Sequence, residues 1–430
     1  MAIDPEPQPF PTAAQIPLQN FNLPQFPREA ANLKHLTLTS DIKPTEYADF
    51  LATPLSQDAI NPSIPEGIDS LTLELFSLGY PAPFLTRLGK ALPRLKALTL
   101  YSHLIDGVSD DSRRDAGEFI HKALVGAKGD AGNSNGSGLR ELHLLDAFCR
   151  KGFVSGIGDI LDDLDSPEQG TQSALRFLEV SYTYRGHSDS DFLSRIPAEE
   201  LPALLVSSLI AASFRLSPPA SGSDTGLSDV PDDPADVDEN GERVSGKKPE
   251  GIIPFSSAHS GALLLVDRLI GRASKEVKDV NDPENEPTPS EPPKLRMLDC
   301  TLYTLSLDQL EQILNYQKEL AILNASVLLS TGGENTKRAL LNTLQSSGKN
   351  MEVVEIVGVP EKEDQQFAES LDRATYFNSV LPSAADMRDL SAILPHLESL
   401  SMNILRAPGL GSVSWVRKDG EWVDEEARGD

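Results

Sequence analysis

A short apolar pattern recurs along this chain and limits the folds that are open to it. Its clearest copy spans residues 95–100, with leucine at the first, fourth and sixth positions. The last two apolar residues lie two positions apart, so in a β-strand both side chains point to one face, which must be buried. Nine such triplets occur: Leu33/Leu36/Leu38, Ile68/Leu71/Leu73, Leu95/Leu98/Leu100, Leu139/Leu142/Leu144, Leu175/Leu178/Val180, Leu295/Leu298/Cys300, Leu320/Leu323/Ala325, Met351/Val354/Ile356 and Leu397/Leu400/Met402.

The stretches between the triplets have the apolar spacing of amphipathic helices. Phe84, Leu85, Leu88 and Leu92 share one helical face, and comparable stripes precede the later triplets. These stretches end near proline, glycine or polar clusters, where helices commonly stop. Parallel strands need helical crossovers of this kind. The sequence therefore predicts an α/β fold in which parallel strands alternate with helices.

The triplets and their alternation with helix patterns resemble a leucine-rich-repeat protein of the ribonuclease-inhibitor-like type, in particular the repeat region of fungal F-box/leucine-rich-repeat proteins. The resemblance covers residues 33–405 and implies an irregular solenoid with parallel strands on its concave side and helices on its convex side. Two features depart from the family. The asparagine or cysteine that follows each strand in regular repeats is missing, and the thirty residues before Leu33 are too few and too proline-rich for the helical F-box module.

Composition divides the chain into three expected parts. Residues 1–30 are proline-rich and predict an extended arm. Residues 31–405 form the expected solenoid, with insertions at 217–250 and 274–293 whose polar composition predicts disorder. Between the insertions, residues 262–270 predict a buried helix, and residues 192–216 predict a helix interrupted at Pro197 or Pro202. Residues 406–430 form the expected C-terminal hairpin and acidic tail.

The expected hairpin turns at Asp419-Gly420 and holds both tryptophans of the chain, Trp415 and Trp422. Two interpretations of these side chains are open. They form a cap over the last repeat, or they form an aromatic docking site. An open repeat array must cover its exposed end, which favours the cap.

Charge and cysteine content narrow the classes of partner. The chain has 65 acidic and 38 basic residues and a net charge of -27, which disfavours nucleic acid and anionic membranes. Two interpretations of the acidic excess are open: it favours a basic protein partner, or much of it belongs to loops that are expected to be disordered. Two cysteines, Cys149 and Cys300, cannot form a four-cysteine metal site or a disulfide framework. No cofactor or metal is expected. The first ten residues lack a signal-peptide pattern and residues 201–216 are too short and polar to span a bilayer, so we expect a cytoplasmic or nuclear protein.

Side chains on the outward strand positions form the expected binding surface. They mix aromatic rings, acids and imidazoles without clustered Lys or Arg, as is typical of a protein-binding face. The hypothesis is a non-enzymatic interaction scaffold, a monomer or part of a hetero-complex. The resemblance adds the role of substrate receptor in ubiquitylation. The candidate residues are His35, Glu74, Tyr101, Glu141, His143, Phe177, Glu179 and Asp299.

An alternative hypothesis is a serine hydrolase that uses the stretch Gly186-His187-Ser188. This stretch follows an apolar strand and resembles a G-x-S-x-G nucleophile elbow, which needs glycine on both sides of the turned serine. Ser190 stands where the second glycine belongs. A polar loop whose serine caps a following helix explains the same residues.

Overall fold

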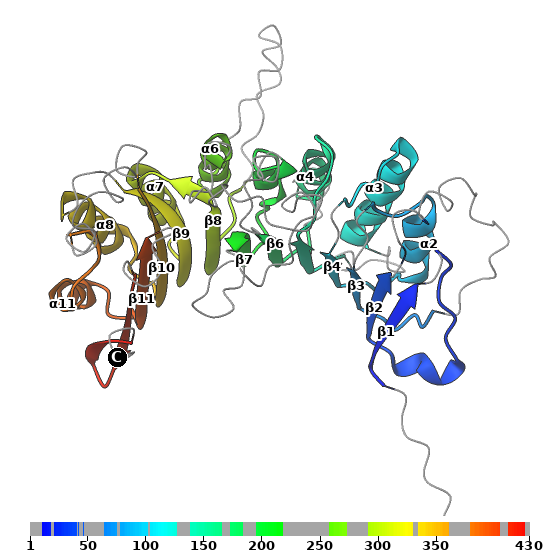
Figure 1. Cartoon of the computed structure of the whole chain (residues 1–430), viewed down its shortest axis with the longest axis horizontal. Coiled ribbons are helices and arrows are strands. Elements are labelled where there is room, and N and C mark those ends of the chain that lie inside the picture. Colours follow the sequence, from blue (N-terminus) through cyan, green and yellow to red (C-terminus); the bar gives the residue numbers. More distant parts are fainter. Residues whose placement is uncertain are drawn as a thin grey trace, which may run out of the picture. The chain divides into compact units, whose positions relative to one another are not determined.

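Figure 1 labels the helices and strands of the computed structural model of the chain. The chain divides into two compact units. The first unit comprises Met1–Val180 with Ala203–Leu209, and the second comprises Ser181–Pro202 with Ile210–Asp430. The described residues are 11–18, 21–40, 42, 46, 64–74, 78–101, 104–126, 138–165, 173–183, 195–217, 258–272, 291–329, 334–360, 379–404 and 412–425.

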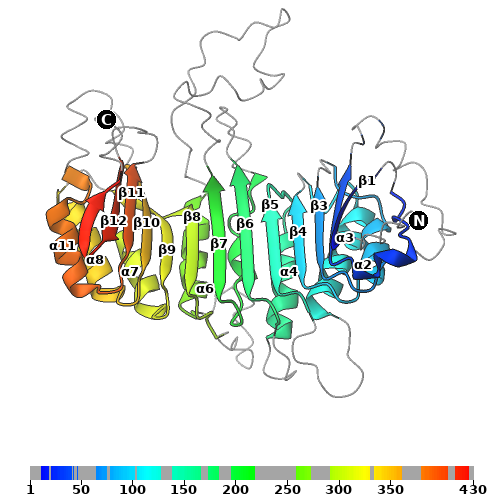
Figure 2. The ribbon, with the colours of Figure 1, turned by 90° about the horizontal axis from the view of Figure 1, so that it is seen from below.

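The first unit is a parallel sheet with helices on one face. In sheet order, which is also chain order, its strands are β1 (Ala13–Leu18), β2 (His35–Ser40), β3 (Ser70–Glu74), β4 (Ala97–Tyr101), β5 (Glu141–Leu145) and the first half of β6 (Phe177–Thr183). Helices α2 (Phe84–Ala91), α3 (Asp110–Val125) and α4 (Phe153–Leu164) lie behind these strands in Figure 2. The short 3-10 turn η1 (Arg28–Asn32) also belongs to this unit, whereas η3 (Leu201–Leu204) has residues in both units.

The second unit repeats this alternation and ends in an antiparallel hairpin. Its strands are β7 (Ala211–Ser217), β8 (Met297–Leu305), β9 (Ile322–Leu329), β10 (Val353–Pro360), β11 (Ser399–Ile404), β12 (Ser412–Lys418) and β13 (Glu421–Asp424). Strands β7 to β11 are parallel, whereas β12 and β13 are antiparallel to their neighbours. Its helices are α6 (Ala258–Leu269), α7 (Leu307–Tyr316), α8 (Glu334–Ser347) and α11 (Ala384–Ile393).

The nine predicted triplets form the core beneath the helices. Every one of their side chains is at most 4% exposed. Burial of an aliphatic side chain stabilises a fold by about 1.5–3 kcal/mol, so these rows dominate the packing. The strand register also aligns the middle residues of successive triplets: Leu36, Leu71, Leu98 and Leu142 in the first unit, and Leu298, Leu323, Val354 and Leu400 in the second. The prediction of side-by-side strands with one buried face is confirmed.

A shared carbonyl fixes the start of each strand. The Lys96 carbonyl accepts the N–H groups of Arg140 and Glu141 at 2.7 and 3.0 Å. The same two-to-one pattern repeats at the residue after the first apolar position of other repeats: Lys34, Asp69 and Arg140 in the first unit, and Ile210, Arg296, Ala321 and Glu352 in the second. Thr12, directly before β1, accepts the N–H groups of Lys34 and His35 in the same way. The triplet therefore marks not only the buried face but also the place where pairing begins.

Helix capping follows local sequence. Ser306 and Gln309 form a reciprocal capping box at the start of α7, with bonds of 2.8 and 3.2 Å. Ser383 and Asp386 do the same at α11. Ser109 accepts the N–H of Ser112 at the start of α3. Each cap satisfies N–H groups that the first helical turn leaves without partners.

Two strands lie where the sequence predicted something else. Strand β7 occupies the end of the stretch 192–216 that we expected to be helical, and only Leu201–Leu204 forms a short 3-10 turn. Ala212 and Phe214 of β7 are buried, so this strand is a tenth, unrecognised copy of the triplet. Strand β1 lies inside the expected extended arm and pairs with β2. Pro17 is tolerated there because, among the described residues, β1 has a strand on one side only.

The expected C-terminal hairpin is present. Asp419 and Gly420 have φ angles of 54° and 86°, which the tight two-residue turn requires. Trp415 is buried, and its indole N–H donates to the Pro382 carbonyl at 3.0 Å. It lies opposite Leu400 of the last parallel strand, which agrees with the cap interpretation. Trp422 is half-buried and pairs with Arg417.

The boundaries of the three sequence-based parts stay a prediction, and most residues of both insertions lie outside the described residues. The same holds for Gly186, His187, Ser188 and Ser190. Of the helices in the described ranges, none combines the length and the apolar character needed to cross a bilayer.

Candidate protein-binding face

Strand register arranges the outward side chains of the first unit in rows. Thr99 of β4 is paired with His143 of β5, and Tyr101 is paired with Glu74 on one side and Leu145 on the other. Phe177 donates its N–H to the Arg140 carbonyl just as Glu141 donates to the Lys96 carbonyl, so Phe177 lies beside Glu141. These positions alternate with the buried triplet residues and therefore point away from the helices.

His143 lies at the centre of these rows. Its Nδ1 is 2.7 Å from a carboxylate oxygen of Glu179, and its Nε2 is 3.8 Å from a carboxylate oxygen of Glu141. An ionised carboxylate can only accept, so the imidazole N–H donates to Glu179. The pair fixes the orientation of Glu179 across β5 and β6. The carboxylate of Glu141 lies beyond hydrogen-bond distance and stays open to a partner.

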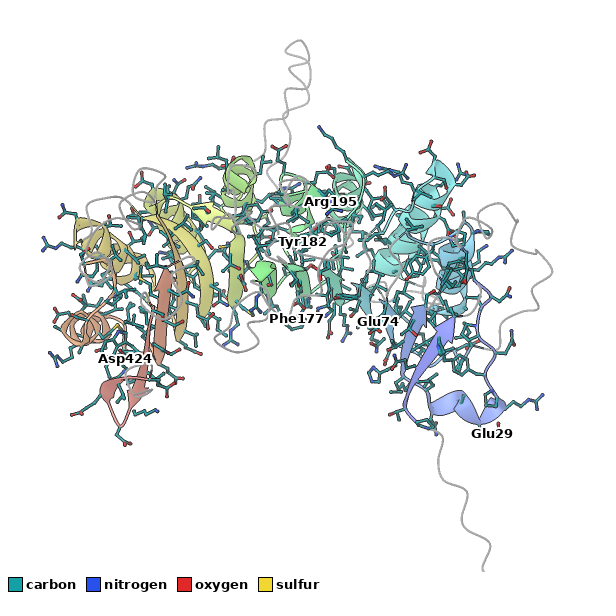
Figure 3. All side chains as sticks on the ribbon, viewed as in Figure 1. Glu29, Glu74, Phe177, Tyr182, Arg195 and Asp424 are labelled. Carbon is teal, nitrogen blue, oxygen red and sulfur yellow. The ribbon has the colours of Figure 1, made fainter. Side chains whose placement is uncertain are left out.

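Two aromatic rings are exposed on the same face. Phe177 is 44% exposed and Tyr101 is 36% exposed. Each has an acidic neighbour in its own row, Glu141 beside Phe177 and Glu74 beside Tyr101. Figure 3 shows Glu74 and Phe177 on the face away from the helices. Exposed aromatic rings on a flat face are typical of sites that bind another protein.

Among the described outward positions of β1 to β5 and the start of β6, none is Lys or Arg. Two basic side chains that could have neutralised the face are held at the start of the strands instead. Lys34 donates to the Gly67 carbonyl at 3.1 Å, and Arg176 donates to the Ser208 carbonyl at 2.8 Å. Both carbonyls directly precede the first apolar residue of the next repeat. These cations therefore brace neighbouring repeats.

The face brings together six of the eight candidate residues: Glu74, Tyr101, Glu141, His143, Phe177 and Glu179. His35 is exposed on the same face but lies on β2, three strands from His143. Asp299 belongs to the second unit and is only 3% exposed, because β8 bulges between Asp299 and Thr304. Its carboxylate accepts the N–H and hydroxyl of Thr301 at 3.1 and 2.8 Å. The prediction that Asp299 lies on the exposed binding surface is therefore wrong.

The second unit carries an outward apolar row that the sequence interpretation did not single out as a site. Met297, Ile322 and Val353 occupy the third position of three repeats, are half-buried, and lie side by side through strand pairing. Val416 and Val423 of the hairpin pair with each other, and Ser399 of β11 lies between Val353 and Val416. An apolar residue directly before the middle leucine was the available signal.

Within the described residues, the cysteines and histidines do not come together in one cluster. Cys300 is buried, and burial followed by the nearby Asp299 carboxylate raises the pKa of its thiol far above the usual range. It is thus held protonated, as expected for a structural thiol. Cys149 is half-buried. Within the described ranges, no group of three or more His, Cys, Asp or Glu side chains is arranged to hold a metal ion.

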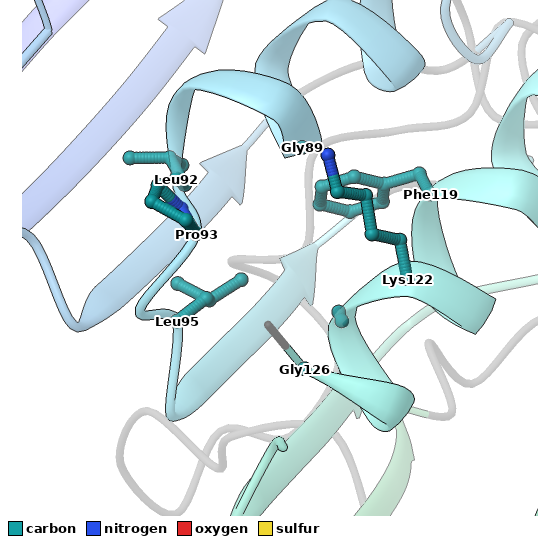
Figure 4. A pocket seen from close by; sticks show the side chains of 8 residues that line it. Gly89, Leu92, Pro93, Leu95, Phe119, Lys122 and Gly126 are labelled. Atoms are coloured by element: carbon teal, nitrogen blue, oxygen red, sulfur yellow. The ribbon is translucent and has the colours of Figure 1, made fainter. Parts of the chain in front are cut away.

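A small, mostly apolar cavity of about 40 Å³ lies between the C-terminal ends of α2 and α3 (Figure 4). Gly89, Leu92, Phe119 and Lys122 line it, and Phe119 fills the space over Gly89. Partial burial, followed by repulsion from Lys90, lowers the pKa of Lys122. Ligand pockets typically enclose about 300–1,000 Å³, so this cavity is a packing defect rather than a ligand site.

A polar network that the sequence did not reveal ties together the loops after β4 and β5. The Asp106 side chain is fully buried and accepts from Arg113 Nη1 at 3.1 Å and from Arg150 Nε at 3.0 Å. Its other oxygen accepts the Arg150 backbone N–H at 3.1 Å. Asp115 on α3 accepts the N–H groups of Leu85 and Thr86 at the start of α2, both at 2.9 Å. These contacts are structural, because they join the loops and helices that follow the strands of the exposed face.

No protein-family model matches the chain, and no curated protein is significantly similar to it.

Proposed function

We propose that this chain is a non-enzymatic scaffold that binds another protein through the outward sheet face of its first unit. The observation that carries the proposal is the pair of exposed rings, Phe177 and Tyr101, on a rigid sheet. Buried triplets fix the strands beneath them, so both rings are presented with little further loss of conformational entropy on binding. Aromatic anchors surrounded by polar groups are typical of binding hot spots.

Site-specific photocrosslinking tests this proposal. The residue p-benzoyl-phenylalanine replaces Phe177 in one variant and the exposed His121 of α3 in another, which places the crosslinker on the opposite face of the same unit. We expect a discrete protein adduct from position 177 only, and its loss on further substitution Tyr101→Ala. Equal adducts from both positions would show that the sheet face has no special role.

The proposal includes a finer assignment, namely that the units are an irregular leucine-rich-repeat solenoid of the F-box type. Helices alternating with a mostly parallel sheet support it. In that case the protein bound at Phe177 is a substrate for ubiquitylation. Deleting the gene for this chain should then lengthen the cellular half-life of the crosslinked protein, and an unchanged half-life would leave a scaffold without a ligase role.

The non-enzymatic part of the proposal has its own test. A fluorophosphonate probe reacts covalently with activated serines, so we expect no labelling that depends on Ser188. Labelling of the full chain that disappears in Ser188→Ala would instead establish a serine hydrolase.

A further inference from the structure

We propose that the face binds an extended segment of a basic partner through two arginine side chains. One arginine contacts the pair formed by Tyr101 and Glu74, and the other contacts the pair formed by Phe177 and Glu141. This inference rests on the proposed function and adds the chemistry of the partner to it.

The two pairs have the same construction. In each, an exposed ring and a carboxylate occupy one row on adjacent strands, β4 with β3 and β6 with β5. Side chains of one row on neighbouring strands are separated by about one strand spacing, roughly 4.8 Å. A guanidinium can therefore stack on the ring while its N–H groups bond the carboxylate. The planar fork of arginine fits both contacts, whereas the compact ammonium of lysine fits only one.

The distance between the pairs sets the spacing of the two arginines. From one pair to the other the path crosses two strand spacings and four residues along the strand. With about 4.8 Å per strand and 3.3 Å per residue, the separation is about 16 Å. An extended segment covers this span in about five residues. Successive side chains of an extended segment point to opposite sides, so two arginines on one side lie an even number of positions apart. Four positions span about 13 Å and the long arginine side chains cover the remaining ~3 Å, so the expected motif has two arginines separated by three residues.

Charge supports a cationic occupant over an acidic or purely apolar one. Glu141 has 48% of its side chain exposed, and its carboxylate lies 3.8 Å from Nε2 of His143. That distance is too long for a hydrogen bond, and the other ring nitrogen of His143 is bonded to Glu179, so the imidazole does not neutralise Glu141 by a hydrogen bond. With no Lys or Arg on the described outward positions of this unit, and a chain charge of -27, the face attracts cations.

Fluorescence anisotropy with synthetic peptides and the full chain tests the inference. The probe is a fluorescein-labelled Gly/Ser peptide that carries two arginines separated by three residues. A matched peptide replaces both arginines with citrulline, which keeps the shape and removes the charge. We expect the arginine peptide to bind about tenfold or more tightly, the factor that one lost charge-assisted hydrogen bond gives. Equal binding of the two peptides would overturn the inference.

A second peptide and matched variants test the geometry. A second peptide, in which only one residue separates the two arginines, should bind about fivefold or more weakly, because its arginines reach only one of the two pairs at a time. Glu141→Gln and Phe177→Ala should each weaken binding by a similar factor. Glu355→Gln and Tyr316→Ala, at exposed positions of the second unit, serve as controls for net charge and for loss of an aromatic ring. Controls that weaken binding as much as Glu141→Gln and Phe177→Ala would show nonspecific attraction and overturn the inference.

The two proposals fail in distinguishable ways. If position 177 crosslinks a discrete protein whose binding survives Glu74→Gln and Glu141→Gln together, the scaffold stands and the arginine-bearing partner is excluded. If the arginine peptide binds with the expected spacing but no protein is crosslinked, the chemistry of the face stands and its use as a scaffold is not supported.

Discussion

Replacing Asp106 by alanine should destabilise the first unit more than any surface change nearby. The Asp106 side chain is fully buried and receives three hydrogen bonds, two from the guanidinium groups of Arg113 and Arg150 and one from a backbone N–H. Removing one partner of a buried ion pair costs about 3–5 kcal/mol when the other charge stays buried. Here Arg113 and Arg150 keep 30% and 34% of their side chains exposed, so water can partly replace the lost carboxylate.

We therefore expect Asp106→Ala to lower the free energy of unfolding by about 2–3 kcal/mol, below the range for a fully buried pair. The matched control is Asp110→Ala, which removes a 3.2 Å contact to the same Arg150 from a side chain that is 97% exposed. That contact is in water and its loss should not be measurable.

Urea unfolding followed by far-ultraviolet circular dichroism measures both variants, with the slope of the transition as a check that the unfolded state is unchanged. Equal midpoints for Asp106→Ala and Asp110→Ala would refute the reasoning, because they would show that the buried carboxylate contributes no more than the exposed one.

Three further predictions concern the second unit. Leu298→Ala removes a fully buried side chain from the triplet row and should cost about 2–5 kcal/mol in urea unfolding, whereas a change under about 1 kcal/mol would mean that the row is loosely packed. Trp415→Phe keeps a ring but removes the N–H that bonds Pro382, so we expect a loss of about 1–3 kcal/mol, and an unchanged thermal midpoint would contradict this. Partial burial tends to raise the pKa of Asp386, but hydrogen bonds from Ser383 and the nearby Lys337 outweigh it, so the pKa lies below its ordinary value of 3.8. The ionised cap therefore stabilises α11 at pH values above its ordinary pKa, and this stabilisation is lost as the pH falls through the lowered pKa. We expect Asp386→Asn to be less stable than the parent at pH 7 and to differ less from it in strong acid. A stability difference that does not depend on pH would argue against the cap.

Periodicity in the sequence was sufficient to predict most of the strands. The three apolar positions specify one buried face, and the structure buries each of them. Strand β7 was missed because its triplet is Leu209, Ala212 and Phe214, in which alanine weakens the pattern, and because the leucines just before it suggested a helix. Strand β1 was missed because prolines surround it, although an edge strand tolerates them.

The sequence predicted which residues belong to the candidate site, but it did not predict which of them are neighbours. Alternation along a strand places Tyr101, His143 and Phe177 outward, so the sequence identifies them as surface residues. Which of them are neighbours depends on strand register, and register depends on backbone bonds at the strand starts. The burial of Asp299 depends on the bulge in β8, for which the sequence carries no recognisable signal.

The shared carbonyl at the start of each strand has a consequence for how such a chain can change. Because register is set at that point, residues added between one strand and the next helix do not shift the side chains that face inward. Doubling the length of a flexible connection costs only about 0.6 kcal/mol in closure entropy. The intervals between successive triplets range from 27 to 44 residues from Leu33 to Leu175, and from 25 to 86 residues from Leu209 to Leu397. One sheet geometry within each unit therefore tolerates connections of very different length. Foreign peptides grafted into these connections should leave the strand alignment intact, which makes this fold a host for displayed sequences.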